Sequence, residues 1–177
     1  MAVQRRNKHI FVFGIFAVDI SFYVDKKVKP GETIIAKGSN IGPGGKASNQ
    51  AISARKLGGA TTLITRLGND NFNSYANSIW RKEKLSTSAK IDRTLPTGMA
   101  GIFIDDKTGE NSVIVHPGAS AQLGMNDFNS QKSKMQKGDI FLTQFEQSSD
   151  TTFSVLKEAR KLGMITIFNP APFGKIN

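Results

Sequence analysis

The ten residues Gly42-Pro43-Gly44-Gly45-Lys46-Ala47-Ser48-Asn49-Gln50-Ala51 stand between a glycine-rich segment and a helical pattern. Glycines have no Cβ, so their backbone can approach a small polar ligand closely. The start of the following helix offers unpaired N–H groups. Lys46 and Asn49 are three residues apart, so they share one side of the first helical turn. Together these features predict a binding site for a polyhydroxylated molecule.

Two other interpretations fit parts of this stretch. A P-loop needs G-x-x-x-x-G-K-[ST], but here Ala47 stands at the hydroxyl position and Asn40 at that of the first glycine. The relaxed form of a dinucleotide-binding loop matches Gly42-x-Gly44-x-x-Ala47. This motif needs an acidic residue at the end of the next strand, but the strand expected at 61–67 is followed by a glycine and reaches an acidic residue only at Asp70. The P-loop is excluded, and a dinucleotide-binding oxidoreductase remains the alternative.

Apolar runs and helical periodicities alternate along the whole chain. Such alternation predicts an α/β fold, with a doubly wound, mostly parallel sheet flanked by helices. The expected strands are 10–16, 61–67, 140–143 and 165–168, and the expected helices are 48–57, 71–84, 126–136 and 150–162.

Other segments alternate between polar and apolar residues and do not fit this order. They are 21–24, 33–37, and a hairpin of 99–104 and 112–116 around a polar loop. Alternation is typical of strands with one solvated face. We therefore expect a small second sheet outside the main one, with its apolar face covered by a ligand or a second subunit.

Composition excludes several classes of protein. The chain has 177 residues and no cysteine, so disulfides, thiolate metal sites and a cysteine nucleophile are excluded. It has 24 Lys and Arg against 14 Asp and Glu, a net charge of +10. The positive residues are dispersed without interleaved aromatics, so we expect no nucleic-acid partner. The sequence contains no run of 18 or more apolar residues, so no membrane span is predicted. Met1–His9 does not resemble a signal peptide, and we expect a cytoplasmic protein.

Several motifs occur in a fixed order along the chain. Because of these motifs, the sequence from about Ile10 resembles the ribokinase-like (PfkB) family of carbohydrate kinases. Within that family it resembles ribokinases most. The glycine stretch matches the ribokinase pattern G-G-K-G-A-N-Q-A. The other matching pieces are Pro30–Thr33, Thr97-Gly98, His116–Ala119, Gln144–Glu146 and Asn169–Pro172.

The resemblance implies an ATP-dependent sugar kinase that uses Mg²⁺, with a β-sheet lid often used for homodimerisation. It implies a sugar, ribose or a related one, between lid and main sheet, and Met99 and Gly101 on the covering lid strand. Ribokinases usually carry asparagine where this chain has Ala17. We expect the loss of this amide to weaken or redirect sugar recognition. The sugar-binding residues implied by the match are Asp19, Gly44, Gly45, Lys46, Asn49 and Glu146.

The resemblance also bears on domain organisation. The family's second signature, a glycine-rich anion hole with the catalytic-base aspartate, follows well beyond the segment that matches Asn169–Pro172. We therefore expect residues 1–177 to be the N-terminal part of one ribokinase-like domain, with lid segments at about 20–38 and 97–116. No catalytic or metal-ligating residue is assigned. The expected function is a sugar kinase that is inactive in this form, with a non-catalytic sugar-binding remnant as a further alternative.

Overall fold

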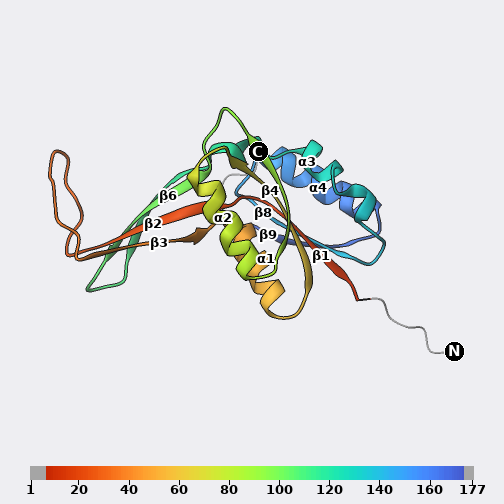
Figure 1. Cartoon of the computed structure of the whole chain (residues 1–177), viewed down its shortest axis with the longest axis horizontal. Coiled ribbons are helices and arrows are strands. Elements are labelled where there is room, and N and C mark those ends of the chain that lie inside the picture. Colours follow the sequence, from red (N-terminus) through yellow and green to blue (C-terminus); the bar gives the residue numbers. More distant parts are fainter. Residues whose placement is uncertain (1–6, 174–177) are drawn as a thin grey trace.

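The main sheet, sheet A, consists of five parallel strands in the order β5-β4-β1-β8-β9 (Figure 1). The structure is a computed structural model that describes residues 7–173, so the expectation about a signal peptide lies mostly outside the described residues. The strands are β1 His9–Phe13, β4 Ala60–Gly68, β5 Ser86–Asp92, β8 Ile140–Gln144 and β9 Ile165–Asn169.

Helices cover both faces of sheet A, so the prediction of a doubly wound α/β fold is confirmed. Alternation along β1 explains the two cores, because Phe11 and Phe13 face one side and Val12 faces the other. Trp80 is only 1% exposed and belongs to the core on the Val12 side. The helices are α1 Lys46–Lys56 and α2 Asn71–Lys82 on the Val12 side, and α3 Met125–Asn129 and α4 Ser149–Lys161 on the other. Two 3-10 turns, η1 Gly118–Gln122 and η2 Lys132–Lys134, lie on either side of α3 in the chain.

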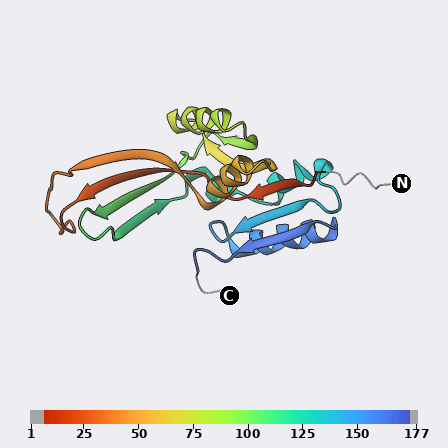
Figure 2. The same cartoon turned by 90° about the horizontal axis from the view of Figure 1, so that it is seen from below.

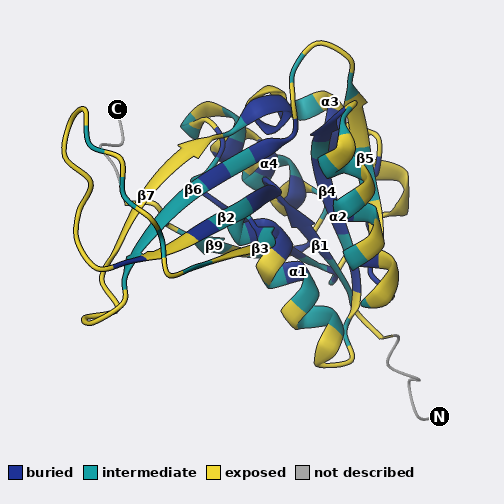
Figure 3. Ribbon diagram, turned by 60° about the vertical axis from the view of Figure 1, so that its left-hand side comes forward, coloured by how far each residue is buried: buried dark blue, intermediate teal, exposed yellow. Residues whose placement is uncertain are grey.

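A second sheet, sheet B, extends away from sheet A as a separate arm, as the sequence predicted (Figure 2). Its order is β3-β2-β6-β7, in which only the β2–β6 pair is parallel. Figure 3 shows β7 largely exposed, whereas β2 and β6 are more covered near the body of the protein. The strands are β2 Ala17–Val24, β3 Gly38–Gly44, β6 Gly98–Asp105 and β7 Asn111–His116.

The strand expected over 33–37 is wrong, and the strand lies just after it, at β3. The chain after β1 bends at Gly14, so β2 begins at Ala17, earlier than the expected residue 21. Its partner β3 has seven residues, whereas the expected strand 33–37 has five. The first segment of sheet B, from the start of β2 to the end of β3, therefore spans residues 17–44, whereas the first lid segment was predicted at about 20–38. The glycine-rich segment, for which no strand was predicted, forms seven cross-strand pairs with β2.

Two further differences concern polar segments. The helix expected over 126–136 ends at Asn129, since Ser130 Oγ donates to the Asp127 carbonyl and competes with helix continuation. Strand β5 was not predicted because it lies at an edge of sheet A and carries mostly polar residues. No helix among the described residues has the length and apolar character needed to cross a membrane.

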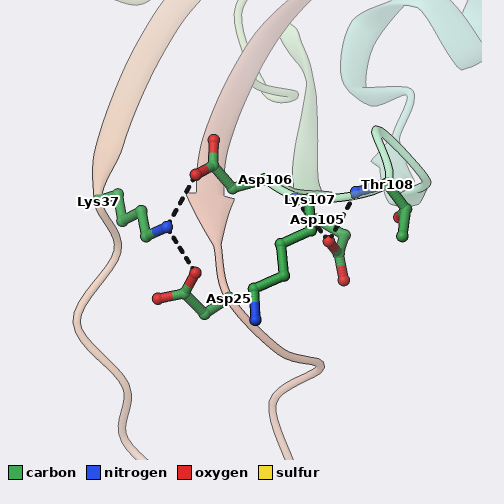
Figure 4. Close-up of polar contacts among 6 residues, drawn as sticks. All are labelled: Asp25, Lys37, Asp105, Asp106, Lys107 and Thr108. Carbon is green, nitrogen blue, oxygen red and sulfur yellow. Dashed lines mark hydrogen bonds and ion pairs between the residues drawn. The ribbon is translucent and has the colours of Figure 1, made fainter.

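Lys37 ties two loops together at the far end of sheet B (Figure 4). Its Nζ lies 2.8 Å from Asp106 Oδ2 and 2.6 Å from Asp25 Oδ1. Hydrogen bonds to Asp106 and then Asp25 raise the pKa of the Lys37 ammonium. The loop between β2 and β3 is thereby held to the β6–β7 hairpin, although such exposed pairs contribute little stability.

Candidate functional site

A cleft of about 230 Å³ lies between sheet B and the carboxyl ends of the strands of sheet A. Strand β1 is central in sheet A, and the chain continues to β4 on one side of it and to β8 on the other. Ligands in open α/β sheets bind at the carboxyl ends of strands next to such a switch point. The cleft receives Ile15 after β1, Gly45 and Lys46 at the start of α1, and Glu146 after β8.

The structure brings together the side chains predicted from the sequence. Asp19, Lys46, Asn49 and Glu146 all line this cleft, although they come from three separate parts of the chain. Lys46 and Asn49 face it from the first turn of α1, as their spacing indicated. The placement makes these residues one candidate site, and their individual roles toward a ligand remain proposals.

Asp19 is the unusual group of the cleft. Among the described residues, no hydrogen-bond donor or ion-pair partner contacts its carboxylate. Burial raises the pKa of the Asp19 carboxyl, and the nearby positive charge of Lys46 offsets part of that shift. A half-buried carboxylate without a protein partner can accept hydrogen bonds from a ligand in the cleft.

Gly44 makes room for this carboxylate. A Cβ at Gly44 would lie 2.0 Å from Asp19 Oδ1, so any side chain there would displace it. Gly44 therefore supports the site through Asp19, and it does not line the cleft itself.

Glu146 is bound to the start of α1. The Lys46 backbone N–H donates to Glu146 Oε2 at 2.6 Å, and Lys46 Nζ lies 3.2 Å from Glu146 Oε1. A carboxylate at a helix N-terminus is favoured by the helix dipole and satisfies an N–H that the helix leaves free. Gly45 lets the start of α1 lie against the chain that follows β1, because its φ is 84° and a Cβ would lie 2.4 Å from the Ile15 carbonyl oxygen.

The opposite wall of the cleft is apolar and comes from β6 and β7. It consists of Ala100, Ile102, Val113 and Val115. Met99 and Gly101 lie on β6, the strand that was expected to cover the site. Alternate residues of a strand face opposite sides, however, and Ala100 and Ile102 are the β6 residues that line the cleft. These aliphatic residues were not predicted from the sequence, although the alternation of polar and apolar residues in the hairpin could have identified them.

Ala17 lies at the base of sheet B, where the cleft wall offers no polar side chain. It pairs with Gly44 on β3 and with Gly98 on β6. The two glycines carry no side chain, so the row Gly44–Ala17–Gly98 presents a single methyl group. A ligand hydroxyl placed against this row would have no side-chain partner from it.

The dinucleotide interpretation finds no support in the position of its glycines. Gly42 and Gly44 lie within antiparallel β3 of sheet B, whereas that motif requires the turn that follows a strand of the parallel sheet. Within residues 7–173, no three His, Asp or Glu side chains gather where they could hold a metal ion.

Comparisons with known proteins agree with this architecture. A ribokinase of Dictyostelium discoideum is 34% identical over 156 residues, which cover 88% of this chain and 49% of the relative. A deoxyribokinase of Salmonella typhi is 30% identical and is covered to 53%, with 92% of this chain matched. The structure of Arabidopsis thaliana ribokinase complexed with ribose and ATP has a TM-score of 0.79 at 25% identity, covering 93% of this chain and 54% of that one.

The chain thus spans about half the length of the curated relatives it matches. The pattern of the pfkB family of carbohydrate kinases matches residues 7–173, nearly all of the chain. The resemblance stated from the sequence is confirmed, and the chain belongs to the pfkB carbohydrate kinase family.

Proposed function

We propose that the cleft binds a sugar, ribose or a related pentose, as the sugar-binding part of an ATP-dependent sugar kinase. The observation that carries the proposal is the half-buried Asp19 carboxylate that has no partner among the described residues. A carboxylate accepts hydrogen bonds from two sugar hydroxyls at once. The Arabidopsis relative with ribose and ATP supports the substrate class.

The other cleft residues suit the same ligand. The Asn49 amide both donates and accepts, and the Lys46 ammonium donates, so together they match hydroxyls that do both. Ala100, Ile102, Val113 and Val115 offer an aliphatic surface to the C–H groups of the sugar ring. The cleft therefore has one polar wall and one apolar wall, as a sugar with both kinds of surface requires.

We propose phosphoryl transfer only for the whole protein. The residues of this cleft do not by themselves provide the groups that the reaction needs. Such reactions depend on positioned Mg²⁺ ions and charge-stabilising groups around the transferred phosphoryl. The described residues do not fit a Mg²⁺–ATP site, since they include no metal-ligating cluster and Glu146 is bound by Lys46. We therefore propose that residues 1–177 bind sugar without phosphorylating it.

The test is a sugar panel measured by calorimetry on the full chain, followed by a coupled ADP-release assay. We expect pentoses to bind and no sugar-dependent ADP release. The panel includes D-ribose and 2-deoxy-D-ribose, because the row around Ala17 offers no side-chain partner to a hydroxyl.

The same assays distinguish the alternatives. Binding without turnover supports a sugar-binding module, and turnover that survives repurification and is lost in the K46A variant contradicts the lack of catalysis. A titration with NADH addresses the oxidoreductase alternative, for which tight NADH binding and no sugar binding would be required.

We also propose that a second copy of the chain covers the exposed apolar residues of sheet B. Val113, Ile114 and Val115 on β7 are 49%, 70% and 54% exposed. Ile114 faces away from the cleft that Val113 and Val115 line, and an exposed aliphatic residue on an edge strand favours pairing with another chain. Sedimentation equilibrium should show a dimer that dissociates in the I114K variant; a monomeric wild-type chain at all concentrations would contradict the proposal.

A further inference from the structure

We propose that Asp70 is a positioning residue that sets the angle between sheet B and the body of the protein. It does so by tying Thr97, the residue before β6, to the start of α2. These contacts lie at the junction of the two sheets, apart from the residues that line the cleft. The effect on the angle can be measured without a ligand, and only its consequence for sugar affinity rests on the proposed function.

Sheet B extends as an arm from one end of sheet A (Figure 2). Four chain passages form the junction, namely the starts of β2 and β6 and the ends of β3 and β7. One wall of the cleft comes from β6 and β7, and the other comes from residues of the body, including Lys46 and Glu146. The width of the cleft therefore depends on how the junction holds the arm.

Both carboxylate oxygens of Asp70 are hydrogen-bonded. Oδ2 accepts the backbone N–H of Thr97 at 2.7 Å, and Oδ1 accepts the Thr97 hydroxyl at 2.8 Å. Oδ1 also accepts the backbone N–H of Asn73 at 3.2 Å, which caps the start of α2. Burial alone would raise the pKa of the Asp70 carboxyl, but the hydrogen bonds, those from Thr97 first, outweigh burial and lower the pKa. An ionised carboxylate thus joins the start of a helix to the start of a strand through strong, charge-assisted hydrogen bonds.

Thr97 is also packed against the end of β4. It is fully buried, and its hydroxyl oxygen accepts the Gly68 N–H at 2.9 Å. A Cβ on Gly68 would lie 2.3 Å from the Thr97 nitrogen, so the two backbones lie against one another. At Gly98, the next residue, a Cβ would lie 2.9 Å from the carbonyl oxygens of both Phe16 and Pro117. The segments that lead into β2 and β6 and out of β7 therefore meet at one point, beside Thr97.

The position of β6 determines the position of the apolar wall of the cleft. Strand β6 is an inner strand of sheet B, paired with β2 on one side and β7 on the other. Ala100, three residues after Thr97, lines the cleft, and so does its partner on β7, Val115. Helix α2 contacts sheet B again farther out, where the Tyr75 hydroxyl donates to a carbonyl of β3 at 3.1 Å. Asp70 thus lies where one side chain can fix the angle of the whole arm.

The angle can be measured directly, because the chain has no cysteine of its own. Nitroxide labels on K107C, at the far end of sheet B, and on S154C, in α4, report the distance between arm and body by pulsed electron spin resonance. Both positions are exposed. Labelled chain is diluted with an excess of unlabelled chain, so that distances between two copies do not contribute. We expect one narrow distance distribution when Asp70 is present.

The D70N variant is expected to broaden this distribution and to weaken sugar binding about tenfold in calorimetry. Asparagine caps a helix as well as aspartate does, so α2 keeps its start. Its side chain has one acceptor oxygen in place of two, and its NH₂ group faces a donor of Thr97. Apparent affinity falls with the fraction of the chain in the binding orientation, so a tenfold loss corresponds to an orientation held about a tenth of the time.

T97V is a second variant for the same contacts. Valine has the shape of threonine without the hydroxyl, so it removes the bonds of that group to Asp70 and Gly68, while the backbone N–H of residue 97 keeps its bond to Asp70. We expect less broadening than in D70N. The double variant should show less than the sum of the two effects, because both substitutions break one set of contacts.

D127N is the matched control. Asp127 is likewise a carboxylate that accepts a backbone N–H, from Gly124, and joins a helix to β4, through Arg66. It lies in α3, which covers the other face of sheet A from α2. The D127N substitution should lower the temperature of thermal unfolding without broadening the distance distribution or weakening sugar binding.

A distribution of equal width in D70N and the wild-type chain would overturn the proposal. Equal broadening in D70N and D127N would overturn it too, because the cause would then be a general loosening of the fold. Should D70N not fold, T97V decides, and a distribution of wild-type width in T97V would contradict the role of Asp70. A wild-type chain that binds no sugar would refute the proposed function, while the distances still test the positioning of sheet B. Broadening with unchanged sugar affinity would support that positioning and overturn only its consequence for the sugar.

Discussion

Replacing Asp19 by asparagine is expected to weaken sugar binding by at least about 100-fold in calorimetry. A hydrogen bond to a charged group contributes about 1.5–3 kcal/mol, and the Asp19 carboxylate can accept two of them. The amide of the D19N variant keeps the shape of the side chain, but it has one acceptor oxygen and no charge. The loss is large because no other side chain of sheet B that lines the cleft is polar.

The matched control is D106N, which removes a carboxylate at the far end of the same sheet. Asp106 pairs with Lys37 on the surface and does not line the cleft, so its replacement should leave sugar affinity unchanged. Equal affinity of D19N and the wild-type chain for every sugar that binds would refute the role of Asp19.

The pH dependence of binding gives an independent check on Asp19. Sugar hydroxyls donate to the ionised carboxylate, and burial raises the pKa of this group above its usual value of 3.8. Affinity should therefore be complete above the raised pKa and should fall as the pH drops through it, at a higher pH than for an ordinary aspartate. The residual affinity of D19N should not follow this titration.

The same pKa shift predicts the effect on stability. A carboxyl whose pKa is raised in the folded state is less favourably ionised there than in the unfolded chain, so its ionisation lowers the free energy of unfolding as the pH rises through that range. The D19N variant has no carboxyl at this position, so it lacks this destabilising ionisation. Thermal unfolding at neutral pH should thus show no destabilisation, which distinguishes a binding defect from a folding defect.

Sequence periodicity was sufficient for the main body of the fold. The apolar run at 10–16 predicts a strand buried on both faces, and the pattern of Phe72, Ala76 and Trp80 predicts a helix with one buried stripe. The helix appears as α2, and the strand appears as β1, which ends at Phe13 because the chain bends at Gly14. The candidate polar residues were identified through the family resemblance, and the spacing of Lys46 and Asn49 also placed these two on one side of the first turn of α1.

Interactions between distant segments were not predictable in the same way. Strand β3 consists largely of glycine and polar residues, and only pairing with β2 makes it a strand. The contact between Lys46 and Glu146 joins residues 100 apart in sequence and depends on how β8 and α1 meet. The face that β6 turns to the cleft depends on its register, which a shift of one residue reverses.

The role of Gly44 leads to the last prediction. The G44A variant should lose about 10- to 100-fold in sugar affinity while it unfolds at nearly the wild-type temperature. Its backbone lies in an ordinary strand conformation, so alanine causes no strain there. The new methyl group would, however, stand 2.0 Å from Asp19 Oδ1 and 2.4 Å from its Cγ, so the carboxylate must rotate away from its position.

The neighbouring Gly42 offers a closely matched control. It lies two residues away on the same strand, directly opposite Asp19 in the register, and a Cβ there would meet only Asn40 Nδ2 at 3.7 Å, an ordinary contact. G42A should therefore bind sugar like the wild-type chain. Equal affinities of G44A and G42A would mean that the exact position of the Asp19 carboxylate does not determine binding. A loss confined to G44A would connect this glycine to the site through one side chain, because the two substitutions differ only in what the added methyl group touches.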